Sequence, residues 1–298
     1  MHCANVTAEE GKRPIFTSAM TFLGTLREPR ILLHNLNMTI LDTIVEKKKL
    51  EVADAKAKVT IETLQSYPMF ARTCYSLKES VRERGTNGII AEFKRASPSK
   101  GLINGEASVE EVVRGYQQAG ASAVSVLTDG DFFQGSLDDL VIARQHLSIP
   151  LLRKEFIVDT YQIAEAKAYG ADIILLIAAC LTPKEVNDFA DYAKTLGLNV
   201  LLEVHHEEEL QQNLIESVDA IGVNNRNLKD FTVDLQHSYD LVNKIPDRYI
   251  KVSESGIADP HTINALKAAG FNGFLIGENF MKTNDPAAAI KEFAETMG

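Results

Sequence analysis

Eight short apolar runs, separated by segments of helical composition, constrain the fold of this chain more than any other feature. The runs are GIIAEFK from Gly88, AVSVLTD from Ala123, PLLRKEF from Pro150, DIILLIAA from Asp172, NVLLEVH from Asn199, AIGVNN from Ala220, YIKVSES from Tyr249 and GFLIGE from Gly273. They are continuously apolar rather than alternating, as strands are when both faces of a parallel sheet are buried. Each run and the segment after it span roughly 20 to 35 residues, the length of one βα unit.

The segments between the runs carry the start and stop signals of helices. SVEEVVRGYQQAG, PKEVNDFADYAKTLG and PHTINALKAAG each open with Ser or Pro, and they end at Gly120, Gly197 and Gly270. Ser caps a helix N-terminus, Pro suits the first turn, and Gly ends a helix because it adopts the left-handed conformation. The pattern therefore predicts strands that alternate with helices.

Eight βα units in about 210 residues predict an α/β fold, the (β/α)8 TIM barrel, over residues 88–298. A doubly wound open sheet usually has fewer units and carries a glycine-rich nucleotide-binding turn after its first strand. Neither GxGxxG nor GxxxxGK[ST] occurs at any strand-to-helix junction. The barrel is therefore the favoured architecture.

Residues 38–87 predict an N-terminal helical extension before the barrel. ILDTIVEKKKLEVADAK, after Thr39, has Ile40, Leu41, Ile44 and Val45 on one side of a helix, and a second helix is predicted from about Ile61 to Glu83. We predict that residues 1–37 are a disordered or non-native extension, since they lack the charged start, apolar stretch and cleavage site of a secretory signal. Met38 directly precedes the first helix, which suggests that translation begins there.

Composition excludes several classes of partner and site. Against 31 Lys and Arg stand 41 Asp and Glu, for a net charge of −10, which argues against nucleic acid but allows a small anionic ligand. No apolar run approaches the roughly 20 residues that span a bilayer. Cys3, Cys74 and Cys180 are scattered and odd in number, which suits a reducing cytoplasm. We expect no metal, because His205 and His206 are adjacent and point to opposite faces of an extended chain.

Polar residues interrupt the apolar runs where predicted strands end. Barrel enzymes gather their active sites at the C-terminal ends of the strands. A single charge there is usually solvated, but Lys and Glu together at several strand ends favour a catalytic site, because such a cluster keeps one group protonated and another ionised. Glu92 and Lys94 share one face of their strand. The strand-end residues are Glu92, Lys94, Arg95, Arg153, Lys154, Glu155, Glu203, Asn224, Asn225, Arg226, Ser253, Glu254 and Ser255, and those taken as site residues are Glu92, Lys94, Lys154, Glu203, Asn224, Arg226, Glu254 and Ser255.

Two glycine-containing loops predict a phosphate site. Barrels often bind phosphate on the loops after strands seven and eight, through backbone N–H groups and a short helix. Ser255 and Gly256 follow the seventh strand, and Gly277, Glu278 and Asn279 follow the eighth. Phe133 and Phe156 lie in or near strand-end loops, where an aromatic side chain is either a core residue or part of the wall of an aromatic substrate's pocket.

The motifs resemble those of one enzyme family, the indole-3-glycerol-phosphate synthases. IIAEFKRASPSKGLI, from Ile89 to Ile103, is similar to that family's signature, and LTDGDFFQGSLDDL, LLRKEFIVDTYQI, LLEVHHEEEL, IGVNNRNL, VSESGI and FLIGENFM resemble its later strand-end motifs in order. The resemblance runs from about Ile40 almost to the C-terminus. It implies a cofactor-free lyase of tryptophan biosynthesis that converts 1-(2-carboxyphenylamino)-1-deoxyribulose 5-phosphate to indole-3-glycerol phosphate, carbon dioxide and water.

The resemblance also implies roles for individual residues. It makes Lys154 the general acid of ring closure, Glu203 the acid–base of dehydration, Lys94 the lysine that binds the substrate anion and assists dehydration, and Glu92 its charge partner. Asn224 and Ser255 match supporting catalytic positions. The resemblance does not assign each proton transfer to one of Lys94, Lys154 and Glu203.

Binding roles follow from the same resemblance. Arg226 and the loops at Gly256 and Gly277 match phosphate contacts, while Ser97 and Ser99 lie in a loop after the first strand that could close on the ligand. The helix after Thr39 resembles the segment with which this family covers the barrel mouth.

Two other functions compete with this prediction. Phosphoribosylanthranilate isomerase is a phosphate-binding barrel too, but it would keep the phosphate loops without the EFKRASPS stretch or the EVH glutamate. A non-catalytic binding barrel would not need several charges buried around its mouth, since burying them costs stability. We therefore expect an enzyme with a small sugar-phosphate substrate, present as a monomer or weak oligomer, without nucleic-acid or membrane partners.

Overall fold

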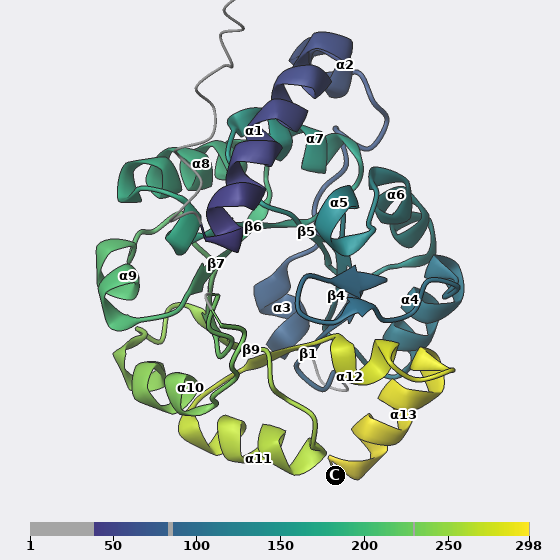
Figure 1. Cartoon of the computed structure of the whole chain (residues 1–298), viewed down its shortest axis with the longest axis vertical. Helices are drawn as coiled ribbons and strands as arrows, with labels where there is room; N and C mark the ends of the chain where they lie inside the picture. The colour runs from purple at the N-terminus through teal and green to yellow at the C-terminus, as the bar shows by residue number, and fades with distance from the viewer. Residues whose placement is uncertain (1–38, 83–85, 229, 298) are drawn as a thin grey trace, which may run out of the picture. The chain divides into compact units, whose positions relative to one another are not determined.

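Eight parallel strands close into a barrel in the computed structural model, which describes residues 39–82, 86–228 and 230–297 (Figure 1). The strand order around the barrel is β1-β10-β9-β8-β7-β6-β5-β4. The strands are β1 (Ile89–Phe93), β4 (Ala123–Leu127), β5 (Leu151–Lys154), β6 (Ile173–Ile177), β7 (Asn199–Val204), β8 (Ala220–Asn224), β9 (Ile250–Glu254) and β10 (Gly273–Ile276). Each lies within one predicted apolar run, so the predicted TIM barrel is confirmed.

Helices surround the barrel and connect successive strands (Figure 1). The predicted helix signals act as expected: the Ser108 side chain accepts from the Glu111 N–H, and Gly270 ends its helix in the left-handed region at φ 116°. The helices are α4 (Val109–Gln118), α5 (Gly130–Phe133), α6 (Leu137–His146), α7 (Thr160–Ala168), η1 (Ala178–Cys180), α8 (Pro183–Thr195), α9 (Glu207–Gln212), α10 (Gln236–Leu241), η2 (Val242–Lys244), α11 (Pro260–Ala269), α12 (Glu278–Met281) and α13 (Pro286–Thr296).

The segment before the barrel differs in part from its prediction. Helix α1 (Ile40–Lys58) forms as predicted, and Thr39 and Asp42 cap it reciprocally. The single helix predicted from Ile61 to Glu83 is wrong, because α2 (Ile61–Gln65) and α3 (Leu77–Arg82) are separated by turns and irregular chain. Pro68 explains the break, since it has no backbone N–H to continue a helix. The predictions for residues 1–37 and for a start at Met38 lie outside the described residues.

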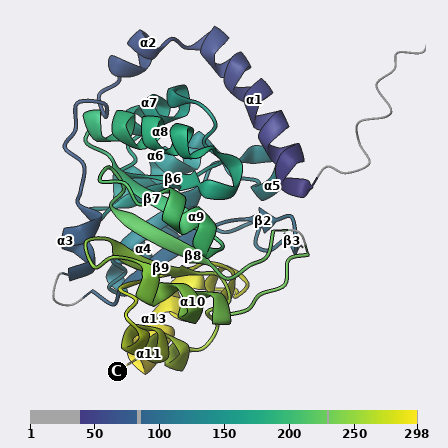
Figure 2. The same cartoon turned by 90° about the vertical axis from the view of Figure 1, so that its left-hand side faces the viewer.

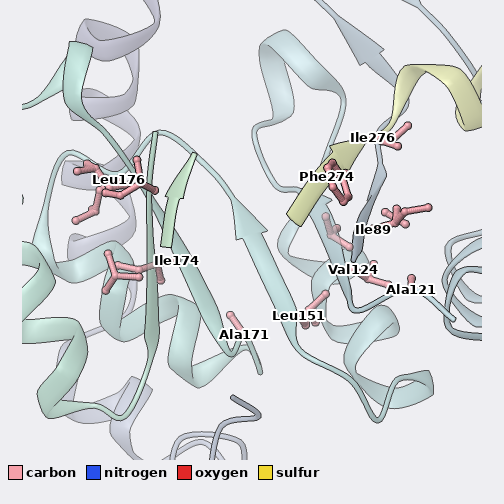
Figure 3. Close-up of a cluster of buried hydrophobic side chains, with 14 of the residues drawn as sticks. Ile89, Ala121, Val124, Leu151, Ala171, Ile174, Leu176, Phe274 and Ile276 are labelled. Atoms are coloured by element: carbon pink, nitrogen blue, oxygen red, sulfur yellow. The ribbon is translucent and has the colours of Figure 1, made fainter. Parts of the chain in front are cut away.

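The strands separate two apolar clusters. The inner cluster fills the barrel and includes Ile173, Leu175 and Ile177 of β6 and Leu77 of α3. Helix α3 lies at the end of the barrel away from α5 (Figure 2). Ile174 and Leu176, the alternate residues of the same strand, belong to the outer cluster between strands and helices (Figure 3). An inward-facing residue that follows the last apolar residue of its strand, such as Lys154 after Leu152, therefore lies at the C-terminal end of the barrel.

Helix α1 and a small hairpin lie at the mouth where the strands end. Val52 of α1 packs with Leu64 of α2 against Tyr161 and Ala164 of α7. The chain after β1 forms the antiparallel pair β2 (Ala96–Ser97) and β3 (Gly101–Leu102), on the same side of the barrel as α5 (Figure 2). In the described part of the chain, no helix combines the length and apolar character of a membrane span.

Candidate active site

A cavity of about 630 Å³ opens at the C-terminal ends of the strands. All the site residues predicted from sequence contribute to its wall. They are Glu92, Lys94, Ser97, Ser99, Phe133, Lys154, Phe156, Glu203, Asn224, Arg226, Glu254, Ser255, Gly256, Gly277, Glu278 and Asn279. Residues up to 187 positions apart in the chain therefore meet at one place because the parallel strands all end there.

Strand alternation decides which strand-end residues reach the cavity. Lys154 lies two residues after Leu152, a member of the inner cluster, and therefore points into the barrel. Its neighbour Arg153 points the other way, where its guanidinium donates to Glu165 at 2.7 Å and to the Thr128 hydroxyl at 3.1 Å. The same alternation separates Glu254, in the cavity, from the buried Ser253 beside it.

Lys154 is the cation at the centre of the cavity floor. Its Nζ lies 3.1 Å from Glu203 Oε2 and 3.1 Å from Glu254 Oε2. Burial alone would lower the pKa of this lysine, but the carboxylates of Glu254, Glu203 and Glu92 together raise it well above its ordinary value. The ammonium therefore keeps its proton at neutral pH.

The two carboxyl groups beside Lys154 differ in ionisation. Burial raises the pKa of Glu254 to about 7, and the negative charges of Glu203 and Glu92 add to this effect against the attraction of Lys154. Burial acts on Glu203 as well, but Lys154, His205 and Asn224 outweigh it and lower its pKa. One buried site thus holds a carboxylate and a carboxyl group that titrates near neutrality, an arrangement suited to proton transfer.

Hydrogen bonds and the absence of a side chain on a glycine fix the orientation of these carboxyl groups. Asn224 Nδ2 donates to Glu203 Oε1 at 3.0 Å, and the Arg226 N–H donates to Asn224 Oδ1 at 3.0 Å. Gly222 makes room for Glu254, since a Cβ there would lie 2.0 Å from Glu254 Oε1. No larger residue fits at this position unless the carboxyl group moves.

Glu92 and Lys94 form a second ion pair from β1 and the residue after it. Lys94 Nζ lies 2.6 Å from Glu92 Oε1, which confirms that the two side chains share a face. A Cβ on Gly277 would lie 2.5 Å from the same oxygen. The glycine predicted to let backbone approach a ligand therefore also makes space for the Glu92 carboxylate.

One end of the cavity combines cations with glycine-containing loops. Arg226 Nη2 lies 3.4 Å from Glu278 Oε2, and Lys100 Nζ lies 3.7 Å from the other oxygen of the same carboxylate. Asn279 Nδ2 donates to the Ala258 carbonyl at 3.2 Å and thereby joins the loop after β10 to the loop after β9. This end offers positive charge and backbone N–H groups, the features that bind a phosphate.

The loop after β9 has an unusual backbone. Ser255 and Gly256 both have positive φ, 66° and 81°. Serine rarely adopts this conformation, so the loop geometry outweighs a local preference. The strain lies at a residue that lines the cavity, beside a glycine whose Cβ would lie 2.5 Å from Val233.

The wall away from the cations is apolar and aromatic. The rings of Phe133 and Phe156 have centroids 6.1 Å apart, and Ile40, Leu41 and Ile44 of α1 line the same cavity. The family resemblance implied that this helix covers the barrel mouth, but none of its residues was among the predicted site residues. The amphipathic pattern of α1 was the sequence feature that could have assigned these residues to the cavity wall.

Helix α1 is held at the mouth by a buried lysine, Lys48, which was not among the predicted site residues. Lys48 Nζ lies 2.8 Å from Asp129 Oδ2, 3.1 Å from Glu155 Oε1 and 2.6 Å from Glu51 Oε2. Glu155 also accepts from the Phe156 N–H at 2.8 Å. The cluster therefore connects α1 to the aromatic wall.

Other residues of the cavity wall were not predicted, because their sequence context gives only weak evidence that they belong to a site. Lys100 and Lys282 add positive charge, and Leu228, Phe231 and Val233 add apolar surface from the chain after β8. Lys100 lies in the motif KRASPSK, so its position was suggestive, whereas a lysine such as Lys282 after a short helix looks like an ordinary surface residue.

Solved structures similar to this chain share its fold. The crystal structure of 3-hexulose-6-phosphate synthase from Salmonella typhimurium has a TM-score of 0.56 at 10% identity and covers 71% of this chain and 98% of its own. A structure titled "Native KDPGal structure" has a TM-score of 0.51 at 16% identity and covers 72% and 94%. At these identities, the likeness concerns the barrel alone.

Sequence comparisons identify the family. The family model of indole-3-glycerol phosphate synthase matches residues 41–293. The indole-3-glycerol phosphate synthase of Bacteroides thetaiotaomicron is 46% identical over 258 residues, 87% of this chain and 98% of that protein. Those of Acinetobacter baylyi and Campylobacter jejuni subsp. doylei are 42% and 41% identical, and each covers 85% of this chain. The chain therefore belongs to the indole-3-glycerol phosphate synthase family.

Proposed function

We propose that this chain is a carbon–carbon lyase that converts 1-(2-carboxyphenylamino)-1-deoxyribulose 5-phosphate to indole-3-glycerol phosphate, carbon dioxide and water. The observation that carries the proposal is the position of Lys154, a mostly buried ammonium between two carboxyl groups on the floor of a cavity. The cavity has a cationic end for a phosphate and an aromatic end for a carboxyphenyl ring. Its ends thus match the two ends of this substrate.

The substrate is oriented by these two ends. Its phosphate lies against Arg226, Gly256 and Gly277, where it replaces Glu278 as the partner of the guanidinium. Its aromatic ring lies against the rings of Phe133 and Phe156, which contact each other and form one wall of the cavity. This placement leaves the ketone over the floor of the barrel, next to Lys154.

Ring closure uses Lys154 as electrostatic partner and general acid. The aromatic carbon that bears the carboxylate attacks the ketone carbon, and a C–C bond forms while negative charge develops on the ketone oxygen. Lys154 holds its proton tightly, but an alkoxide is a strong base and takes it. Loss of carbon dioxide then leaves its electron pair in the ring and restores aromaticity.

Dehydration uses Glu203 and Lys94. The hydroxyl group made by ring closure leaves as water, and a proton leaves the neighbouring carbon as the double bond of the indole forms. Glu203, ionised beside Lys154 and Asn224, takes the proton from the carbon, while Lys94 binds the substrate anion and donates the proton with which the hydroxyl leaves as water. Ser255 and Glu92 support these groups.

The compartment and partners complete the proposal. Cys74 and Cys180 are free thiols, which suits a reducing cytoplasm. The proposed reaction needs no partner other than its substrate, and it takes place without a cofactor.

The test is turnover of this substrate by the wild type and Lys154→Met, followed by the fluorescence of indole-3-glycerol phosphate without added metal or cofactor. Methionine keeps the length of lysine but has no proton to donate, so kcat should fall about 10³-fold or more. Circular dichroism checks that the variant is folded. Product formation by Lys154→Met at the wild-type rate would refute the role of this residue.

Lys184→Met is the matched control. Lys184 is exposed on α8 and pairs with Asp188 one turn away, so its substitution should leave kcat and KM unchanged. A folded wild type that makes no product would direct attention to another sugar-phosphate reaction in the same cavity.

A further inference from the structure

His205 follows β7 directly and contacts a carboxylate of the site. Its Nε2 lies 3.6 Å from Glu203 Oε1, whereas Lys154 approaches the other oxygen, Oε2. Alternation along the chain explains the contact, because residues 203 and 205 lie on the same side of an extended segment. Glu203 thus has a lysine on one oxygen and an imidazole near the other.

The imidazole of His205 lies between two carboxylates. Its Nδ1 is 3.6 Å from Glu209 Oε2, and the same oxygen accepts the backbone N–H of His205 at 2.7 Å. Both ring nitrogens are buried and lie beyond hydrogen-bond distance of any partner in the described residues. A buried imidazole with a carboxylate near each nitrogen is favoured as the cation, because each N–H then faces a negative charge.

The groups around His205 are mostly acidic. Glu203 faces it from β7, Glu209 from α9 and Glu254 from β9. The thiol of Cys180 in η1 is close to Glu203 and Glu209, but burial raises its pKa to about 12, so it is neutral. Burial lowers the pKa of His205, yet Glu209, Glu203 and Glu254 outweigh burial and raise it above its ordinary value.

We propose that His205 is a positioning residue that bridges Glu203 to Glu209 as an imidazolium and keeps Glu203 ionised for its part in the reaction. This inference rests on the proposed function for its effect on turnover. Glu209 completes the arrangement, since it holds both the backbone and the ring of His205. The positive charge on this side of Glu203 therefore depends on pH, unlike that of Lys154.

Removal of the imidazole should move the acid limb of kcat/KM. In His205→Asn, Glu203 loses one of its two cationic neighbours, so its pKa rises toward the ordinary value and the acid limb moves to higher pH by about one unit. At high pH, where His205 is neutral in the wild type as well, the two proteins should have similar activity. His205→Lys restores a cation and should return the limb toward its wild-type position.

His206→Asn is the matched control. His206 is the next residue and its Nδ1 lies 3.2 Å from Glu209, but its side chain is 66% exposed and makes no ion pair with Glu203 in the described structure. Its substitution should leave the acid limb in place. An equal shift in both variants, or a uniform loss of activity in His205→Asn without a shift, would overturn the proposal.

NMR titration of the Glu203 carboxyl carbon tests the contact without turnover. Its pKa should rise in His205→Asn and stay unchanged in His206→Asn, and an unchanged value in both would overturn the proposal. Because this titration needs no substrate, it separates failure of this inference from failure of the proposed function. If His205→Asn does not fold, Glu209→Gln provides the second variant: it lowers the pKa of His205 and should move the acid limb in the same direction.

Discussion

Glu203 and Glu254 place more negative charge on the barrel floor than Lys154 alone can balance. Both carboxyl groups contact the same ammonium at 3.1 Å. One cation cannot fully stabilise two like charges, so the pKa of one of the two carboxyl groups is raised. Glu254 is that group, because Asn224 donates a hydrogen bond to Glu203, while Glu254 Oε1 is buried without a partner among the described residues.

This charge excess predicts a pH-dependent stability that Glu254→Gln removes. The pKa of Glu254 is raised from 4.5 to about 7, so its folded state binds a proton more tightly than the unfolded chain does. Its stabilising contribution is present below pH 4.5 and is lost as pH rises through about 7, at up to about 1.4 kcal/mol per pH unit.

Urea unfolding at several pH values measures this effect. The free energy of unfolding of Glu254→Gln, relative to the wild type, should increase as pH rises across this window. A difference that does not change with pH would contradict the prediction.

The sequence predicted which residues lie in the site better than it predicted which of them pair with one another. Glu92, Lys94, Lys154, Glu203 and Glu254 could be placed in the site because strand alternation fixes their direction once the strands are known. The pairing of His205 with Glu209 could not, because it depends on how the loop after β7 turns into α9. The same limit applies to Glu278, whose pairing with Arg226 joins segments 52 positions apart.

Helix α1 gives the cavity an apolar wall, and a buried charge holds it there. Lys48 reaches Asp129 and Glu155, which lie in the chain after β4 and β5. A buried lysine of this kind fixes orientation, because its loss leaves carboxylates buried without a counter-charge.

Substitution of Lys48 should therefore loosen α1. In Lys48→Met we expect a loss of about 3 kcal/mol in the free energy of unfolding, together with a raised KM, since Ile40, Leu41 and Ile44 lose their fixed place in the wall. Urea denaturation and steady-state kinetics measure the two effects. The control is Lys49→Met, because Lys49 is 57% exposed and pairs with Glu46 on the same helix. Equal effects in the two variants would show that Lys48 does not hold the helix.

Secondary structure followed the sequence wherever the pattern was long enough. All eight barrel strands and helices α1, α4, α8 and α11 were predicted, because continuous apolar runs and terminal Ser, Pro and Gly have strong local effects. The helix predicted from Ile61 to Glu83 was wrong, because helical composition concealed the effect of Pro68. The β2–β3 hairpin was missed, since two residues per strand leave no periodic signal.

At the scale of the whole molecule, the family match leaves out the N-terminal segment of the chain. The family model begins at residue 41, and the described part of the chain begins at residue 39. We therefore predict that a protein that starts at Met38 keeps the melting temperature and kcat/KM of the full chain. Calorimetry and steady-state assays of both proteins check this, and an order-of-magnitude loss of kcat/KM in the shorter one would contradict it.

The pairing of β1 with β10 has a consequence for synthesis on the ribosome. β1 supplies Glu92 early, but it finds its second neighbour only when β10 emerges, together with the glycine that makes room for the Glu92 carboxylate. Until then the nascent chain presents two unpaired strand edges, which are prone to association with other chains. A chain that stalls before β10 therefore lacks Gly277 and leaves β1 and β9 each with an open edge, which favours association with other chains.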